Sequence, residues 1–369
     1  MNGIKIEFQV WQDTGSGPCV LIPNLQLATK IRNEQVWIST NRVGMHWREV
    51  ALRKPENTQR IAFVGDSFTF GMWANRVENS FVGIVDAEMR RDGFEVLNFG
   101  VPGDGLAEAE LRLQNNILAY SPDYIVLMFY NGNDLSDTYL GAEKTDCSSG
   151  ELKKEVIEAK IPPGFRGSWE QAIKTFLDRN LASFRALRLA KERLFAGSHL
   201  TDPNTLTLTP ATFKVDDRFL TSYFWSRTET PPLAEQAVAE TLRVLDRIWH
   251  LCQKHRVELI IMAIPFRGQV YALPEAGAGY DIALPQRHLE QYAKREDIPY
   301  YDLLPPLRSY VVACREAIYV ENDIHFNTQG HRIVGQLISK FLADRFKLSF
   351  KEQLGVQCLD GTITSIAGP

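Results

Sequence analysis

Four polar segments of the sequence place a hydroxyl, a glycine, a carboxamide and an imidazole beside apolar stretches. They are Ser67 in Gly-Asp-Ser-Phe, Gly103 in Asn-Phe-Gly-Val-Pro-Gly-Asp, Asn133 in Asn-Gly-Asn-Asp, and His325 in Asn-Asp-Ile-His. A serine hydroxyl is a weak nucleophile and attacks a carbonyl carbon when an adjacent base takes its proton. His325 can be that base. Asp323 can hold the tautomer of the ring and stabilise the imidazolium that forms.

The same segments offer donors for the negative oxygen that such an attack creates. Donors aimed at that oxyanion in advance stabilise it, each by on the order of 3 kcal/mol. We expect the backbone N–H groups of Ser67 and Gly103 and the side-chain amide of Asn133 to serve in this way. A glycine at position 103 also lets a substrate come close to the backbone. This chemistry needs no metal ion and no organic cofactor, and we expect neither.

Each of these residues also has an ordinary structural interpretation. Ser67 could simply cap a helix, Asn133 could form a turn, and His325 could be a surface histidine. Gly103 could be a turn glycine, with Gly100 as the functional one. Other polar and aromatic side chains near the segments are expected to have lesser roles. These are turn bonding for Asp66, turn or rim positions for Asp104, Asp134 and Asp137, a helix position for His331, and a pocket wall or core for Trp73, Tyr130, Tyr271 and Phe326.

Alternating strand and helix patterns must position these groups. Apolar runs predict five strands, over residues 60–64, 95–99, 124–130, 257–264 and 298–303. Apolar stripes at helical spacing predict helices over residues 79–93, 106–117, 238–252 and 328–346. Strands joined by right-handed helical crossovers predict an α/β fold, a flavodoxin-like parallel sheet of order 2-1-3-4-5 within a three-layer α/β/α sandwich. In such sheets ligands bind beyond the carboxyl ends of the strands, the edge to which the four polar segments belong.

The four segments resemble the marker blocks of the SGNH/GDSL hydrolase superfamily of serine esterases and acyl hydrolases. Ser67, Gly103, Asn133 and His325 match its Ser, Gly, Asn and His in chain order. Residues 41–45 (Asn-Arg-Val-Gly-Met) are also similar to an approach segment found in many bacterial members. The resemblance covers residues 59–140 and 236–346 well, covers 1–58 weakly and says little about 141–235. It implies an acyl-enzyme mechanism with these residues as catalytic and oxyanion-binding groups.

The sequence departs from the family pattern in two places. The first block reads Gly-Asp-Ser-Phe instead of Gly-Asp-Ser-Leu. In the last block the usual acid stands three residues before the histidine, where this chain has Asn322, and Asp323 stands only two before it. We expect Asp323 to orient His325, as in a D-x-H form of the motif. If its carboxylate points elsewhere, Ser67 and His325 would act as a dyad.

The predicted domain boundaries lie where the alternation of strands and helices along the chain stops. We expect a β-rich arm over residues 1–58, a hydrolase domain over 59–346 and a tail over 347–369. Residues 141–235 interrupt the hydrolase domain as an inserted lid or cap. Within that insertion, the charged run at 151–160 is expected to form a solvated helix face. These additions are expected to decorate one domain and to select the substrate.

Composition excludes several classes of function. There are 41 basic and 45 acidic residues, giving a net charge of −4, so no basic excess exists to bind nucleic acid. No apolar run is long enough to span a membrane. The N-terminus lacks a signal-peptide pattern, because Lys5, Glu7 and Gln9 interrupt its apolar residues, and we expect a cytoplasmic protein. The 5 scattered cysteines indicate neither a disulfide framework nor a zinc site.

We therefore expect a serine-dependent esterase or deacylase that removes short acyl groups from a small molecule or carbohydrate. Short chains are expected because the sequence shows no long apolar stripe in the insertion. Two alternatives stay open. One is an O-acyltransferase that moves the acyl group to a sugar or small-molecule hydroxyl with the same residues. The other is a binding domain without catalysis. The sequence indicates no oligomeric state.

Overall fold

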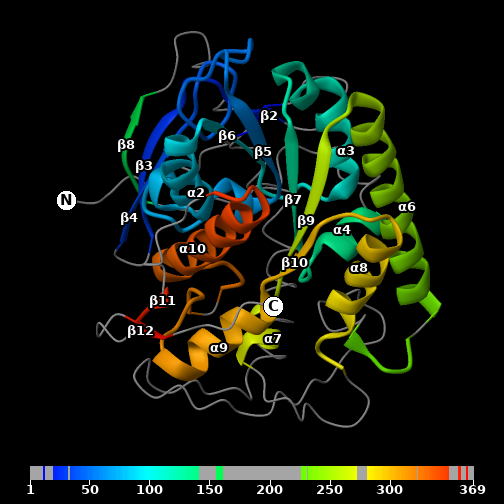
Figure 1. Ribbon diagram of the computed structural model, residues 1–369. Coiled ribbons are helices and arrows are strands. Elements are labelled where there is room, and N and C mark those ends of the chain that lie inside the picture. The colour runs from blue at the N-terminus through cyan, green and yellow to red at the C-terminus, as the bar shows by residue number, and fades with distance from the viewer. Residues whose placement is uncertain are drawn as a thin grey trace, which may run out of the picture. The chain divides into compact units, whose positions relative to one another are not determined.

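The computed structural model describes residues 11–12, 20–31, 34–140, 155–160, 226–230, 232–271, 281–321, 323–348, 356–358 and 363–364 (Figure 1). The chain forms two compact units, which are described separately. One comprises residues 1–50, 75–77 and 142–199, and the other comprises 51–74, 78–141 and 200–369. No helix within the described ranges is long and apolar enough to cross a membrane.

A parallel five-stranded sheet forms the centre of the second unit. Its strands are β5 (Gln59–Gly65), β6 (Phe94–Gly100), β7 (Tyr124–Tyr130), β9 (Glu258–Ile264) and β10 (Tyr300–Asp302). They lie in the order β10-β9-β7-β5-β6, and every neighbouring pair is parallel. Counted along the chain this is the order 2-1-3-4-5, so the prediction is confirmed. Continuous apolar runs suit these strands because both faces of the sheet are covered.

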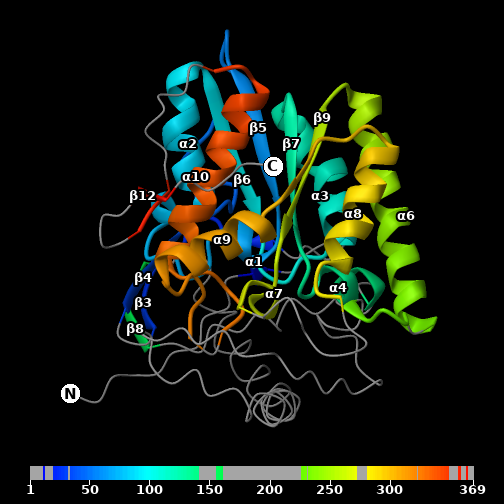
Figure 2. The same cartoon turned by 60° about the horizontal axis from the view of Figure 1, so that its bottom comes forward.

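Helices cover the two faces of this sheet, as Figure 2 shows. On one side α2 (Phe81–Met89) packs against α10 (Thr328–Arg345). On the other side lie α3 (Leu106–Asn115), α6 (Pro232–His255) and α8 (Leu284–Arg295). The three-layer α/β/α sandwich is therefore also confirmed. The other helical segments are α1 (Ser67–Phe70), α4 (Asp134–Leu140), α7 (Arg267–Tyr271), α9 (Leu304–Cys314) and the 3₁₀ turns η1 (Val77–Asn79), η2 (Arg90–Asp92) and η3 (Ile117–Tyr120).

The first unit contains an antiparallel sheet of order β4-β3-β8. Its strands are β3 (Gln26–Ile31), β4 (Glu34–Ser39) and β8 (Glu155–Lys160), and a separate ladder joins β1 (Trp11–Gln12) to β2 (Val20–Leu21). The expected helix face at 151–160 is wrong for residues 155–160, which pair with β3. Local charge spacing suggested a helix, whereas backbone pairing with a distant strand decided the structure. Residues 1–10 of the expected β-rich arm lie outside the described residues.

A disulfide bond joins the end of α9 to the C-terminal segment. Cys314 pairs with Cys358 across a sequence separation of 44 residues, with 5.4 Å between their Cα atoms. Cys358 follows β11 (Val356–Gln357), which pairs with β12 (Ile363–Thr364). The expectation of no disulfide is wrong for this pair, because the spacing of scattered cysteines does not reveal which of them the fold brings together. Disulfides are rare in cytosolic proteins, so the bond weighs against a cytoplasmic location, which stays a prediction.

Two glycines let the turn between β5 and α1 sit directly on the ends of the neighbouring strands. A Cβ atom on Gly100, the last residue of β6, would lie 2.1 Å from the backbone nitrogen of Phe70 and 2.4 Å from the carbonyl carbon of Thr69. A Cβ atom on Gly65 would lie 2.4 Å from Oγ1 of Thr69 and 2.9 Å from the backbone oxygen of Met128. Only glycine allows this approach at position 100, because the obstructing atoms there belong to the backbone, whereas at position 65 both the Thr69 side chain and a backbone oxygen obstruct a Cβ atom.

The Gly100→Ala substitution is predicted to lower the free energy of unfolding by about 3 kcal/mol or more, because overpacking against backbone cannot be relieved by a rotamer change. Gly93→Ala is the matched control. Gly93 has φ +82°, but the nearest atom to its added Cβ would be 3.6 Å away. Only the left-handed backbone conformation should therefore lower the free energy of unfolding of this variant, by about 1 kcal/mol. Urea unfolding of both variants measures the difference, and equal losses would contradict the close approach.

Candidate active site

Ser67 begins α1 immediately after β5 and directly contacts a histidine from a distant part of the chain. Its Oγ atom lies 2.7 Å from Nε2 of His325, 258 residues away in sequence. The side chain of Asp66 caps α1, since its Oδ1 accepts a 2.9 Å hydrogen bond from the backbone N–H of Phe68. Ser67 is nearly buried, with 8% of its surface exposed. The hydroxyl thus lies within hydrogen-bond distance of an imidazole nitrogen.

His325 lies in the loop between α9 and α10, and this loop is fixed at both ends. The backbone N–H of Val320 donates to the carbonyl oxygen of His325 at 2.9 Å, and a β-bridge joins Tyr319 to Phe326. Asn327 caps α10 by accepting from the N–H of Gly330 at 2.8 Å. The capping residue therefore sets the entry to the helix two positions after the histidine and holds the imidazole at the sheet edge.

Asp323 binds the other nitrogen of the same ring. Its Oδ1 atom lies 2.6 Å from Nδ1 of His325 and also accepts a 3.0 Å bond from the backbone N–H of His325. That second bond is the local turn typical of aspartate, in which the side chain binds the backbone two residues on. It explains how an acid only two positions before the histidine reaches the ring. Asn322, at the usual position of the acid, lies outside the described residues.

Gly103 and Asn133 follow the two strands that flank β5. Gly103 comes after β6 and has φ +85°, a conformation that favours glycine, and an added Cβ would meet no atom within 4 Å. Asn133 comes after β7, and its Nδ2 donates to Oδ2 of Asp137 at 2.7 Å. Gly100, the alternative to Gly103, donates its N–H to the side chain of Asn98 at 2.9 Å. Gly100 therefore has a structural task, whereas Gly103 is an exposed residue of the following turn.

The carboxylates around the site serve mainly as internal partners of the backbone and of arginine. Asp134 accepts from the N–H of Tyr130 at 2.8 Å, and Asp104 forms a buried ion pair with Arg112. The sequence suggested turn or rim positions for both. Both are buried, so neither lies at the rim, whereas the turn interpretation fits Asp104, whose N–H donates to the carbonyl of Val101 at 3.1 Å. Asp66 is buried as well. Burial raises its pKa to about 7, with the charges of Asp137 and Asp104 adding to the rise.

The aromatic residues near the site divide into core and surface. Phe68 lies beneath the imidazole, with its ring centre 5.0 Å from that of His325 and 4.3 Å from that of Tyr130. Tyr130 and Phe326 are buried, so they belong to the core. Trp73 and Tyr271 are half-buried, and Nε1 of Trp73 lies 3.3 Å from Nδ1 of His325. Sequence analysis missed Phe68 as the support of the base, although its position next to Ser67 could have indicated it.

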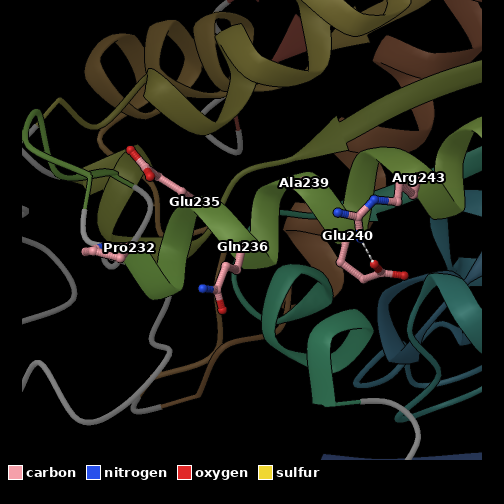
Figure 3. A pocket seen from close by; sticks show the side chains of 6 residues that line it. All are labelled: Pro232, Glu235, Gln236, Ala239, Glu240 and Arg243. Carbon is pink, nitrogen blue, oxygen red and sulfur yellow. Dashed lines mark hydrogen bonds and ion pairs between the residues drawn. The ribbon is translucent and has the colours of Figure 1, made fainter.

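A separate hollow of about 460 Å³ lies along α6 (Figure 3). Its lining comes from one helix and includes the ion pair between Glu240 and Arg243. The lining residues are Pro232, Glu235, Gln236, Ala239, Glu240 and Arg243. None of them is a serine or histidine, so this hollow offers no nucleophile and no base of the kind found beside Ser67.

Residues 61–183 match the family model described as GDSL-like Lipase/Acylhydrolase. This segment contains Ser67, Gly103 and Asn133, so the family resemblance of the sequence motifs is confirmed. No curated protein sequence matches the chain.

Several solved structures are similar to the chain at low sequence identity. One is the acetyl xylan esterase AlAXEase, with 13% identity over 77% of this chain and 98% of that chain and a TM-score of 0.42. A lipase/acylhydrolase from Enterococcus faecalis has 14% identity over 78% of this chain and 97% of that chain, with a TM-score of 0.40. A two-domain esterase active on acetylated mannans has 14% identity over 80% of this chain and 51% of that chain, with a TM-score of 0.42. Similarity at this level does not define a substrate.

The buried carboxyl of Asp66 predicts a pH-dependent stability. A carboxyl whose pKa is raised from 3.8 to about 7 on folding binds its proton more tightly in the folded state. Its contribution is fully present below about pH 4 and is lost as the pH rises through 7. Asp66→Asn keeps a cap acceptor without the charge. It should therefore become more stable relative to the wild type as the pH rises from 4 to 7.5, by at most about 1.4 kcal/mol per pH unit.

Chemical unfolding of the two proteins at several pH values measures this difference, in which the titration of all unchanged groups cancels. Asp302→Asn should show the same trend, since burial also raises the pKa of Asp302 to about 7. A difference that stays constant between pH 4 and 7.5 would contradict the raised pKa of Asp66.

Proposed function

We propose that this chain, an SGNH/GDSL-type enzyme that acts on ester bonds, hydrolyses short-chain carboxylic esters through an acyl-enzyme on Ser67. The observation that supports this most directly is the continuous chain of contacts from Ser67 to Asp323. Oγ lies 2.7 Å from Nε2 of His325, and Nδ1 of the same ring lies 2.6 Å from the carboxylate. A nucleophile, a base and an orienting acid in this sequence are the parts of serine acyl transfer.

In the first half-reaction Oγ of Ser67 attacks the ester carbonyl carbon and Nε2 of His325 takes the hydroxyl proton. The carbonyl oxygen becomes negative in the tetrahedral intermediate. Asp323 stabilises the imidazolium, which then gives its proton to the departing alcohol as the carbon–oxygen bond breaks. In the second half-reaction a water molecule gives a proton to Nε2 and attacks the acyl carbon. Collapse of that intermediate returns the proton to Oγ and releases the free acid.

The oxyanion is stabilised by the N–H groups of Ser67 and Gly103 and by the amide of Asn133. The left-handed backbone of Gly103, with open space where a side chain would stand, suits a donor that a substrate must approach closely. The amide nitrogen of Asn133 has two N–H groups. One of them donates to Oδ2 of Asp137 at 2.7 Å, and in this proposal the side-chain amide also donates to the oxyanion.

Short acyl groups are proposed because the sequence shows no long apolar stripe in the insertion that could cover an alkyl chain. On the inner side of His325, the rings of Phe68, Tyr130 and Phe326 pack with centre-to-centre distances of 4.3 and 5.0 Å. This side therefore belongs to the core and offers no room for an alkyl chain. A small molecule or a carbohydrate with a short ester, such as an acetyl group, is the substrate class we propose.

Loss of either member of the proton-transfer pair should abolish the reaction. Ser67→Ala and His325→Ala are predicted to lower kcat for p-nitrophenyl acetate by about 10⁴- to 10⁶-fold. The factor by which Asp323→Asn lowers kcat should be about 10 to 100 times smaller than for these two variants, because Ser67 and His325 both remain and only the preferred tautomer of the ring is lost. Ser309→Ala and His255→Ala, which change exposed residues of the same types, are the controls. Activity of Ser67→Ala equal to that of the wild type would overturn the mechanism.

A labelled acyl donor and a fluorophosphonate probe separate this function from its alternatives. The probe should label Ser67 in the folded wild type and fail to label Ser67→Ala, as read by peptide mass spectrometry. An unlabelled wild type would instead favour a binding domain without catalysis. With the acyl donor, free acid alone is expected. Preferential appearance of the acyl group on an added sugar hydroxyl would identify an acyltransferase.

A series of p-nitrophenyl esters tests the length of the acyl group. We predict that kcat/KM is highest for acetyl or butanoyl esters and falls by more than about tenfold for dodecanoyl, since each methylene that cannot be buried forgoes about 0.8 kcal/mol of binding energy. All assays use ester concentrations at which the substrate is dissolved as single molecules and forms no micelles. Equal or higher kcat/KM for the dodecanoyl ester would contradict the short-chain specificity and leave the serine mechanism intact.

A further inference from the structure

Trp73 has a backbone conformation that bulky residues rarely adopt. Its φ angle is +69°, in the left-handed region where a large side chain costs on the order of 1–2 kcal/mol. Such strain persists when the surrounding structure imposes it, and it concentrates at functional sites. Trp73 lies six residues after Ser67, in the segment that follows α1, and its half-buried side chain lies beside His325. The strain therefore calls for an account of what the side chain contacts.

Bonds on both sides of Trp73 impose this conformation. The N–H of Met72 donates to the carbonyl of Ser67 at 3.0 Å, and the N–H of Ala74 donates to that of Gly71 at 3.1 Å. The carbonyl of Met72 lies 2.8 Å from Nε2 of His331 in α10. Burial lowers the pKa of His331 to about 4, so at neutral pH it is an uncharged donor to that carbonyl. This gives His331 a task in the loop of the nucleophile.

The indole of Trp73 shares a ring nitrogen of the base with Asp323. Its N–H points at Nδ1 of His325 with 3.3 Å between the nitrogens, while Oδ1 of Asp323 lies 2.6 Å from the same Nδ1. The two hydrogen bonds require opposite protonation states of Nδ1. The carboxylate of Asp323 accepts a hydrogen bond only when Nδ1 bears a proton, whereas the indole N–H can donate only to an Nδ1 without a proton. Both bonds cannot be complete in one tautomer.

The two tautomers differ in what they let Ser67 do. With the proton on Nδ1, Nε2 has a lone pair and can accept the serine proton. With the proton on Nε2, Nδ1 accepts from the indole, and the ring donates to Oγ and cannot act as a base. Asp323 therefore stabilises the active tautomer and Trp73 the inactive one. The carboxylate bond is charged and shorter, and such bonds are about twice as strong as neutral ones.

We infer that Trp73 is a positioning residue that competes with Asp323 for Nδ1 of His325 and stabilises the inactive tautomer of the base. The inference rests on the proposed serine mechanism. It has an unusual consequence: removal of the indole N–H should not weaken catalysis. In the wild type Asp323 outweighs the indole, so the effect is small. Without Asp323 the indole decides the tautomer, and its removal should increase activity.

The test is a double-mutant cycle with p-nitrophenyl acetate. Trp73→Phe keeps an aromatic ring and removes the N–H. In the wild-type background it should change kcat by less than about twofold. In the Asp323→Ala background it should raise kcat about fivefold with little change in KM, the population shift that one hydrogen bond of ordinary strength controls. Trp249→Phe, at another half-buried tryptophan, is the matched control and should leave kcat of Asp323→Ala unchanged.

Nitrogen-15 NMR of labelled histidine gives a readout that a merely structural role would not move. In Asp323→Ala the shifts should show protonated Nε2 and bare Nδ1 for His325, and Trp73→Phe should move them toward the opposite tautomer. Replacement of Trp73 by benzothienylalanine keeps the shape of the side chain and exchanges the N–H for sulfur. It should act like Trp73→Phe, and it separates loss of the N–H from any perturbation of the loop by the smaller phenyl ring.

Two outcomes would overturn the inference. One is an unchanged or lower kcat when either replacement is added to Asp323→Ala in folded protein, and the other is an unchanged tautomer. Residual activity of Asp323→Ala must vanish with Ser67→Ala. If it does not, the proposed serine mechanism fails, whereas a Ser67-dependent activity that does not respond to Trp73 defeats this inference alone.

Discussion

The close packing of the loop after β5 against the ends of β6 and β7 is the constraint on which the site depends. Gly100 has no side chain, so the backbone of α1 rests on the end of β6, where a Cβ atom would collide with it. A Cβ atom on Gly65 would instead collide with Oγ1 of Thr69 and the backbone oxygen of Met128. Asp66 then caps α1 and directs the chain so that Ser67 stands at the carboxyl edge. The proposed nucleophile is thus fixed largely by backbone contacts, which transmit strain with little relaxation because protein interiors are densely packed.

The base is positioned by different means. His325 belongs to a loop, and loops are ordinarily the adaptable part of a fold. Here a β-bridge, the cap of α10 and the bond from the His325 N–H to Asp323 restrain that loop from both ends. Phe68 adds a direct link, since the residue after the nucleophile packs under the imidazole. The same ring contacts Phe326, the residue after the base, so the core side chains next to Ser67 and His325 set their separation.

The sequence predicted those features that depend on local pattern. Apolar runs such as 124–130 revealed the strands, their alternation with helices revealed the order of the sheet, and that order placed Ser67, Gly103 and Asn133 at one edge. Features that depend on distant partners were not predictable. The segment 155–160 pairs with β3, Cys314 pairs with Cys358, and Trp73 meets His325 across 252 residues. Nothing in the residues next to each of these indicates its partner, because the intervening fold brings the two together.

Asp323 and Trp73 together show what an orienting acid must achieve in this arrangement. An imidazole has two nitrogens, and its use as a base depends on which of them bears the proton. An aspartate two positions before the histidine has little freedom, since its Oδ1 accepts from both the backbone and the ring nitrogen of His325. That restriction is an advantage when a second donor competes for the same nitrogen. A carboxylate held at 2.6 Å by its own backbone turn pays little entropy to stay there and thereby outweighs a neutral indole at 3.3 Å. The short D-x-H spacing is thus sufficient to bring a carboxylate to Nδ1 of His325.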